Sequence, residues 1–240
     1  MKITSRNRFF TNAFLAAAVT LLAAAPTAQA ARAKKQADPA PIVAAEPASP
    51  YTLEIGITAD SAANDLYKSD TEFYSYKAKV STYGADLTGV YALDANRAIT
   101  LRFGFGMGSV DDDVLDGYEH DEWKITRFTL MPGYRYTKDW GNKTQYFIGV
   151  NVGLVQQSVE LTETINGEDG GSESFSGDSI GLGYSAEIGL TYKYSEKVTL
   201  LVAYQLSGST NRTELDYYDE KLKCEQQMYH TIRAGVSVKF

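Results

Sequence analysis

The sequence has few of the residues on which disulfide-stapled folds and small catalytic sites depend. Its 240 residues include one cysteine, two histidines and six prolines. A single thiol excludes an internal disulfide, and two histidines leave few candidates for nucleophilic catalysis. Beyond the N-terminus no window of 18 apolar residues occurs, and the mean hydropathy is −0.27. Together these two facts exclude a helical membrane protein.

Two residue types are abundant instead. The chain has 17 tyrosines and 20 glycines, and 12% of its residues are aromatic. Girdles of aromatic residues at the two membrane interfaces are typical of β-barrels that cross a membrane. The composition therefore suits such a barrel, and the pattern along the chain decides the matter.

The first 50 residues are predicted to precede the folded domain. Residues 1–30 have a basic start, an apolar stretch and a final Ala-Gln-Ala, which is the pattern of a secretory signal peptide. We therefore expect the mature chain to begin at Ala31. Residues 31–50 are rich in Ala and Pro and are predicted to form an extended or disordered periplasmic tether.

From residue 51 onward, strand-like runs alternate with polar connections. In the run 98–108, every second residue from Ile99 to Met107 is apolar, and the residues between them are polar or glycine. This period of two predicts a β-strand with one apolar face. Eight runs carry the pattern: 51–59, 80–92, 98–108, 123–137, 144–159, 179–194, 197–207 and 228–240.

The connections between these runs are alternately short and long. The short ones are turns rich in Asp, Asn, Gly and Ser at 94–97, 138–143 and 195–196. The long ones are polar and span 60–79, 109–122, 160–178 and 208–227. Such sorting is the layout of an outer-membrane barrel, and an even number of strands puts both termini on the short-turn side, the periplasm.

The last run ends on an aromatic residue. Its final eight residues resemble the C-terminal assembly signal of bacterial outer-membrane proteins, which runs polar, any, Gly, any, any, apolar, any, aromatic. Arg233, Gly235, Val238 and Phe240 occupy the four defined positions. The resemblance implies recognition by the barrel-assembly machinery.

Residues 51–240 as a whole resemble the small outer-membrane barrels of the OmpA, OmpX and opacity-protein type. The resemblance rests on the strand layout and the terminal motif. It implies an all-β fold, an eight-stranded antiparallel up-and-down transmembrane β-barrel, located in the bacterial outer membrane and surrounded by its lipid and lipopolysaccharide. Functions differ widely among such barrels, so the resemblance does not supply one.

Six charged residues are predicted to lie inside the barrel at mid-height, because they belong to the faces opposite the apolar ones. They are Glu54, Asp86, Arg102, Arg127, Glu187 and Arg233. The interior of eight strands is just wide enough for side chains to fill, and a lone charge there is costly. We therefore expect the three arginines to pair with the three acids and plug the lumen. Glu54 and Arg233 form the most specific pair, since the first and last strands must be neighbours, whereas Arg135 is predicted nearer the periplasmic end.

No catalytic, cofactor or metal site emerges from the sequence. His230 is predicted to face lipid near the outer interface, where some lipid-modifying enzymes have a catalytic histidine, but no His-x-Ser sequence accompanies it. The acidic segment around His120 lacks the spacing of a calcium loop. Cys224 is interpreted as an incidental exposed residue in a loop.

The four long connections are strongly acidic. They contain 22 acids and six bases, a net charge of −16. This excess argues against nucleic acid as a ligand. It serves either to solvate the loops or to bind a partner, such as lipopolysaccharide bridged by divalent cations or another surface protein.

Three classes of function remain. The sequence favours a non-enzymatic barrel with a structural or surface-interaction role, exercised through acidic extracellular loops. The alternative is a small porin or a channel for hydrophobic solutes, which charges in the lumen disfavour. An outer-membrane enzyme is disfavoured by the scarcity of His and Ser constellations.

Overall fold

The computed structural model describes residues 49–62, 67–68, 80–113, 119–165, 170–217, 220–224 and 227–240. The predicted signal peptide, the expected start at Ala31 and all but the last two residues of the predicted tether lie outside these ranges. Within them every regular element is a strand, and no helix is present that is long and apolar enough to cross a membrane.

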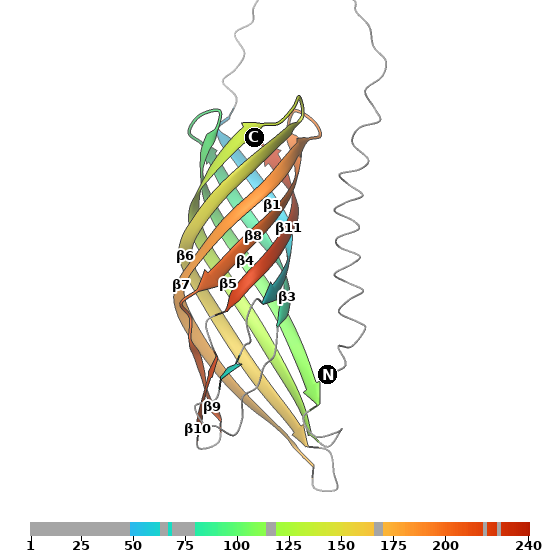
Figure 1. Ribbon diagram of the computed structural model, residues 1–240, viewed down its shortest axis with the longest axis vertical. Coiled ribbons are helices and arrows are strands. Elements are labelled where there is room, and N and C mark those ends of the chain that lie inside the picture. The colour runs from blue at the N-terminus through green and yellow to red at the C-terminus, as the bar shows by residue number, and fades with distance from the viewer. Residues whose placement is uncertain are drawn as a thin grey trace, which may run out of the picture. The chain divides into compact units, whose positions relative to one another are not determined.

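Eight strands form a closed antiparallel barrel (Figure 1). They are β1 (Tyr51–Ala62), β3 (Ser81–Ala92), β4 (Arg97–Asp113), β5 (Glu119–Asp139), β6 (Thr144–Ile165), β7 (Ser172–Lys193), β8 (Val198–Ser209) and β11 (Met228–Lys239). Each pairs with the next along the chain, and β1 pairs with β11, with Leu53 opposite Val238. The predicted eight-stranded up-and-down barrel is confirmed.

Three tight connections lie at one end of the barrel, which we call the turn end; the opposite end is the loop end (Figure 1). Each connection is closed by a backbone hydrogen bond, such as that from Trp140 N to Thr144 O at 2.9 Å. In the first turn, Asp94 Oδ1 accepts hydrogen bonds from the backbone N–H groups of Asn96 and Arg97, both at 2.8 Å. An Asp that satisfies the backbone two and three residues on stabilises a turn, which explains why the chain reverses there.

Four strands extend further toward the loop end than the sequence pattern suggested. The predicted loops 109–122 and 160–178 are largely strand, because β4 pairs with β5 as far as Asp113 and β6 pairs with β7 as far as Thr164. Together these extensions form a four-stranded projection of the barrel wall, which we call the wing. Its strand segments are 109–113, 119–126, 157–165 and 172–180.

A second, smaller sheet lies at the loop end. It comprises β2 (Tyr67–Lys68), β9 (Thr213–Tyr217) and β10 (Glu220–Cys224) in the order β2-β10-β9. The predicted loop 208–227 therefore contains two strands, with Leu222 opposite Leu215. We call this element the small sheet.

The outer surface of the barrel carries a belt of exposed apolar side chains. Ile55, Leu101 and Val150 are 57%, 53% and 59% exposed, and they belong to the outward-facing sets that the alternation predicted. At the turn end the belt is bordered by exposed aromatic residues, among them Tyr51 and Trp140. So much exposed apolar surface is matched to lipid, not to water.

Candidate functional site: a charge cluster inside the barrel

The inward-facing side chains of the barrel are mostly polar, and six charged ones meet at mid-height. We call them the charge cluster: Glu54, Asp86, Arg102, Arg135, Glu187 and Arg233. None of the six is more than 6% exposed. They come from β1, β3, β4, β5, β7 and β11, so six of the eight strands contribute one residue each.

Arg233 occupies the middle of the cluster and has no exposed surface. Its Nη2 lies 2.5 Å from Asp86 Oδ1 and its Nε 2.7 Å from Asp86 Oδ2, which is a bidentate contact. Its Nη1 lies 3.0 Å from Glu54 Oε2, so the predicted pair of first and last strands is present in the structure. A guanidinium held in this way donates to two carboxylates at once, which suits its planar geometry.

The pairs continue across the lumen as an alternating chain. Arg135 Nη1 lies 2.5 Å from Glu54 Oε1, and Arg135 Nη2 lies 3.2 Å from Glu187 Oε1. Arg102 Nη2 in turn lies 2.5 Å from Glu187 Oε2. The order is therefore acid, base, acid, base, acid, base, from Asp86 to Arg102. Every charge in the chain has a partner of opposite sign, which offsets the cost of its burial.

Neutral groups complete the arrangement. Thr88 Oγ1 accepts hydrogen bonds at 3.3 Å from both Arg102 Nε and Arg233 Nη2, and it donates one to Asp86 Oδ1 at 3.2 Å. Thr88 thus links the two ends of the alternating chain. Gly56 leaves the room that the cluster needs, because a Cβ at this position would lie 2.7 Å from Asp86 Oδ2 and 2.8 Å from Arg233 Nε.

Two of the sequence-based assignments to this site need correction. Arg127 was expected in the cluster, but it pairs instead with Asp60, nearer the loop end. Arg135 was expected near the turn end, and it occupies the place in the cluster that Arg127 was predicted to fill. Asp60 was missed because the first strand was predicted to end at residue 59, although Asp60 continues the inward-facing set of Glu54.

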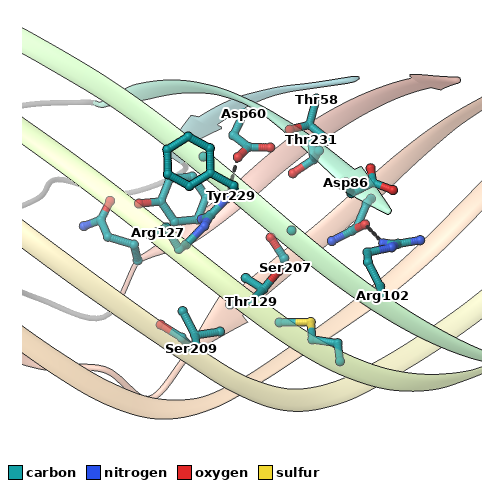
Figure 2. A pocket seen from close by; sticks show the side chains of 18 of the residues that line it. Thr58, Asp60, Asp86, Arg102, Arg127, Thr129, Ser207, Ser209, Tyr229 and Thr231 are labelled. Carbon is teal, nitrogen blue, oxygen red and sulfur yellow. Dashed lines mark hydrogen bonds and ion pairs between the residues drawn. The ribbon is translucent and has the colours of Figure 1, made fainter. Parts of the chain in front are cut away.

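A small chamber lies between the charge cluster and the Arg127–Asp60 pair (Figure 2). Its volume is about 60 Å³, which is room for a few water molecules. Arg127 covers its loop end, with the guanidinium carbon 4.0 Å from the centre of the Tyr229 ring. The remaining walls combine hydroxyl and amide groups, including those of Gln205 and Ser207, with apolar side chains such as Met131 and Val155.

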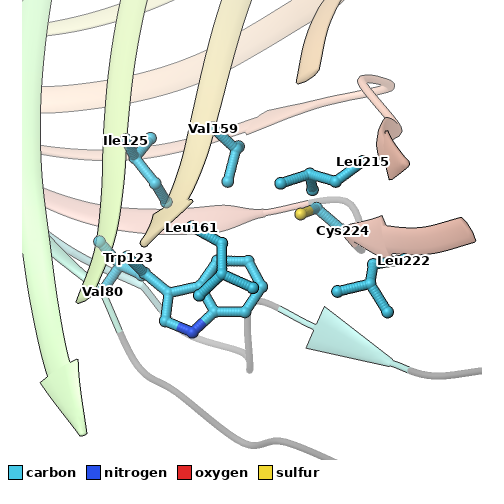
Figure 3. Close-up of a cluster of buried hydrophobic side chains, with 8 residues drawn as sticks. All are labelled: Val80, Trp123, Ile125, Val159, Leu161, Leu215, Leu222 and Cys224. Carbon is cyan, nitrogen blue, oxygen red and sulfur yellow. The ribbon is translucent and has the colours of Figure 1, made fainter. Parts of the chain in front are cut away.

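Beyond the Arg127–Asp60 pair, toward the loop end, the interior becomes apolar. The inward face of the wing packs against the small sheet in a buried cluster, which we call the apolar cap (Figure 3). Its members are Val80, Trp123, Ile125, Val159, Leu161, Leu215, Leu222 and Cys224. Cys224 was predicted to be exposed in a loop, but it lies in β10 and is 1% exposed. Burial raises the pKa of its thiol to about 12, so it is a packing residue and not a nucleophile.

Comparison with known proteins identifies the fold. No family model and no curated relative matches the chain. Among solved structures, the outer-membrane protein OprG from Pseudomonas aeruginosa matches with a TM-score of 0.51 at 18% identity, covering 80% of this chain and 97% of that one. Neisserial surface protein A matches with a TM-score of 0.49 at 15% identity, covering 81% and 100%. The outer-membrane protease OmpT from Escherichia coli matches with a TM-score of 0.46 at 10% identity, covering 81% and 99%.

The chain is a small outer-membrane β-barrel. The apolar belt of its outer surface agrees with that fold, and the protein is accordingly located in the bacterial outer membrane.

The residues of the predicted assembly signal lie along β11, where the barrel closes. Gly235 faces Gly56 across the β1–β11 seam, and Val238 faces Leu53. Phe240 follows the strand, is 68% exposed, and donates its backbone N–H to Tyr51 O at 3.4 Å. The aromatic ring therefore lies on the outer surface at the seam, while Arg233 of the same segment points into the charge cluster.

Deleting Phe240 is expected to reduce insertion more than deleting residues 31–50. Phe240 completes the segment that pairs the last strand with the first, and a barrel without that seam has an open strand edge in lipid. Heat-modifiable gel migration of outer-membrane fractions measures the folded yield, with Phe240→Tyr as the variant that keeps an aromatic ring. Equal folded yields for the two deletions would contradict the expectation.

The two histidines give no metal site in the part of the chain that the structure describes, where no group of three or more potential ligands gathers. His230 is exposed on the outer surface, as predicted, and its Nδ1 lies 2.5 Å from the hydroxyl of Tyr204. Ser61 of β1 lies opposite His230 in the β1–β11 register. A His-x-Ser pattern within one strand cannot detect a serine on the neighbouring strand. His120 is in β5, and its side chain is outside the described part.

Proposed function

We propose that this barrel is closed to ions, is not an enzyme, and has a structural or surface-interaction role in the outer membrane. The observation that carries the proposal is the alternating chain of buried charges from Asp86 to Arg102. A water-filled pore needs a continuous polar path with mobile counter-ions. In the charge cluster each charged group is instead held by a neighbour of opposite sign at 2.5–3.2 Å.

The two strands that contribute no charge supply buried amides to the lumen. Gln205 of β8 accepts a hydrogen bond from Arg102, and Asn151 of β6 donates one to Ser185 Oγ at 3.1 Å. With Gln205, side chains from seven of the eight strands are therefore joined by contacts across the lumen. An ion that entered would have to separate at least one buried pair, and breaking such a pair typically costs about 3–5 kcal/mol.

A second closure supports the same proposal. The apolar cap lies on the loop-end side of the chamber, and four of its residues, Trp123, Ile125, Val159 and Leu161, are between 0% and 3% exposed. An apolar constriction opposes the passage of hydrated ions even where no charge pair blocks the way. In this proposal the apolar cap is a second barrier, unlike the charge cluster, on the other side of the small chamber.

The refolded protein is expected to give no steady conductance in a planar lipid bilayer. A general porin reconstituted in the same membrane is the positive control for insertion and recording. A steady, voltage-independent conductance from the wild-type barrel would reject the closed lumen and would support a small porin or hydrophobic-solute channel instead.

The non-enzymatic part of the proposal concerns the surface residues near the loop end. Acyl hydrolysis needs a nucleophile activated by a base, and His230 is engaged at Nδ1 by Tyr204 while Ser61 lies opposite it. Release of fatty acid from lipopolysaccharide by the wild type, abolished by Ser61→Ala, would overturn this part alone.

The surface-interaction role is assigned to the loop end, where the acidic connections gather. Its partners are lipopolysaccharide or a surface protein, and insertion depends on the barrel-assembly machinery that reads the C-terminal segment. The wing and the small sheet support this role, because their shared apolar core holds the loop end in a defined shape. A preformed surface loses less conformational entropy on binding than a mobile loop does.

A further inference from the structure

The outer face of the wing continues the lipid-facing surface of the barrel. Leu130 of β5, Leu154 of β6 and Leu182 of β7 belong to the belt and are exposed. The three strands keep one pairing register from these residues to the end of the wing. In a strand without a bulge every second residue faces the same side, so the outward set of the belt is also the outward set of the wing.

This surface changes from apolar to polar at the base of the wing. Phe105 and Phe128 face each other across the β4–β5 seam, with ring centres 5.0 Å apart, and Ile180 of β7 lies in the same row of paired residues. In the next row toward the loop end, β5 carries Thr126 and β7 carries Asp178. A change of this kind marks the level at which the lipid-facing belt ends.

Hydroxyl groups predominate on the outer face beyond this level. The outward set of β7 includes three exposed serines, Ser172, Ser174 and Ser176. Two half-exposed threonines of β6 face two of them. Thr162 Oγ1 lies 3.1 Å from Ser174 Oγ, and Thr164 Oγ1 donates a hydrogen bond to Ser172 Oγ at 3.5 Å. A hydroxyl has one O–H and two lone pairs, so each member of these pairs can bind a further partner.

Carboxylates outnumber ammonium groups among the described side chains of the same face. Glu122, Glu160 and Asp178 face outward together with Lys124, whose Nζ lies 3.1 Å from Glu122 Oε2. A face with net negative charge does not by itself attract a phosphate. Carboxylates accept hydrogen bonds and hydroxyls both donate and accept them, which matches the hydroxyl groups of a sugar.

The wing is at the height of the saccharides of the outer leaflet. In the predicted orientation the loop end is extracellular, and the lipid of that leaflet is lipopolysaccharide. At about 3.3 Å per residue, the stretch from Thr126 to Glu122 spans about 13 Å along β5 beyond the lipid-facing belt. The outer face of the wing therefore lies beside the sugars that adjoin the lipid anchors of the neighbouring molecules.

We propose that the outer face of the wing is a docking surface for the core saccharides of lipopolysaccharide. The paired hydroxyls of β6 and β7 bind sugar hydroxyls, and Glu160 and Asp178 accept further hydrogen bonds from them. The occupant is a molecule of the surrounding leaflet, because this surface continues the lipid-facing belt without a break. The inference deepens the surface-interaction role proposed above and rests on it, but it does not depend on a closed lumen.

Binding of a soluble saccharide tests the docking surface directly. The full mature chain is refolded into nanodiscs of phosphatidylcholine, which carry no sugar, and titrated calorimetrically with the lipid-free core oligosaccharide of lipopolysaccharide. Thr162→Val with Thr164→Val removes two outward hydroxyls and keeps the β-branched shape of both side chains. This double variant is expected to bind the oligosaccharide about fivefold more weakly for each hydroxyl that is lost.

Thr137→Val with Thr144→Val is the matched control. These two threonines lie at the turn end and are half-exposed, as Thr162 and Thr164 are. The control should keep the affinity of the wild type, and heat-modifiable migration shows that both variants are folded.

An equal loss of affinity in the two double variants, or no binding by the wild type, would overturn the docking surface. Self-association that only the wing variant abolishes, without oligosaccharide binding, would also overturn it, because the occupant would then be a second copy of the chain. The surface-interaction role itself would survive these results, since the small sheet offers a protein partner a separate surface at the loop end.

Discussion

Replacing Arg233 with methionine is expected to lower the free energy of unfolding by about 3–5 kcal/mol, the usual result of removing one partner from a buried ion pair. The substitution leaves Asp86 without its bidentate partner and Glu54 with Arg135 alone. Uncompensated carboxylates in an interior of low dielectric are costly, and methionine cannot donate a hydrogen bond to either. No other residue of the charge cluster contacts two acids while being wholly buried.

Arg97→Met is the matched control for this experiment. The Arg97–Asp94 and Arg233–Asp86 pairs have the same shortest separation, 2.5 Å. Their burial differs, because the side chains of the first pair are 58% and 39% exposed, and those of the second are 0% and 3% exposed. An ion pair exposed to solvent contributes little to stability, so the control should remain close to wild type.

Urea unfolding in detergent micelles gives the free energies, and a double-mutant cycle shows whether the residues interact. Glu54→Ala with Arg233→Met should be less destabilised than the sum of the two single variants, because each single variant already removes the contact between Glu54 and Arg233. Strict additivity would show that Glu54 and Arg233 do not interact. An Arg233→Met variant as stable as Arg97→Met would show that the buried contacts of Arg233 stabilise the barrel no more than an exposed pair does.

Leu215→Ala is expected to release the small sheet from the wing while the barrel remains folded. Leu215 has no exposed surface and belongs to the apolar cap. Truncating a buried leucine costs about 2–5 kcal/mol, which raises the undocked population at least about thirtyfold. Polar contacts at Asn211 and Thr213 also hold the sheet, such as Asn211 Nδ2 to Val155 O at 3.0 Å.

The single cysteine reports on this change directly. Cys224 is buried in the wild type, so a maleimide should label it slowly, whereas the Leu215→Ala variant should be labelled at least about thirtyfold faster.

The pKa of the docked thiol is about 12, against about 8.5 for an exposed thiol. Docking is therefore fully stable below about pH 8.5 and weakens as the pH rises from there toward 12, because only the undocked thiol ionises in that interval.

Leu182→Ala is the control for the cap experiment, since Leu182 is 57% exposed on the lipid-facing surface. It should leave the labelling rate of Cys224 unchanged. Heat-modifiable migration should be the same for the wild type and both variants, which shows that the barrel persists. Slow labelling in Leu215→Ala would mean that the small sheet is held by something other than the apolar cap.

Much of the barrel could be predicted because its strands obey one rule throughout. A side chain in a β-strand faces either lipid or lumen, so the alternation from Ile99 to Met107 assigned Arg102 to the interior without any knowledge of its partners. The turn at Asp94 could also be predicted, because its hydrogen bonds are local in sequence.

The heights of residues inside the lumen could not be predicted in the same way. Which inward residues meet depends on the tilt and stagger of the strands, a property of the closed barrel that no single strand reveals. Arg127 and Arg135 belong to the same inward set of β5, and the stagger alone decides that Arg135 meets Glu54 while Arg127 meets Asp60.

The apolar cap was missed because its residues are dispersed among charged ones. Leu222 and Cys224 show the spacing of a strand, but lysines lie on either side of Leu222 and the run is short. Trp123 and Ile125 were placed in the predicted run 123–137, but no pattern within that run indicates that they pack against Leu215. The polar residues of β10 alternate with apolar ones and face water on one side. Their polarity led to the prediction of a loop at this segment.

The position of Arg233 has a consequence for the order in which the chain is made. Glu54 and Asp86 belong to the first two barrel strands, whereas the arginine that joins them is on the last. During synthesis and export these two acids precede Arg233 by 179 and 147 residues. A chain that stops short of β11 therefore lacks the neutralising charge for its first strands as well as the final strand itself. The same strand closes the barrel wall and supplies the positive charge that pairs with the two acids. An incomplete barrel is therefore disfavoured in lipid for two reasons, an open strand edge and unpaired acidic side chains.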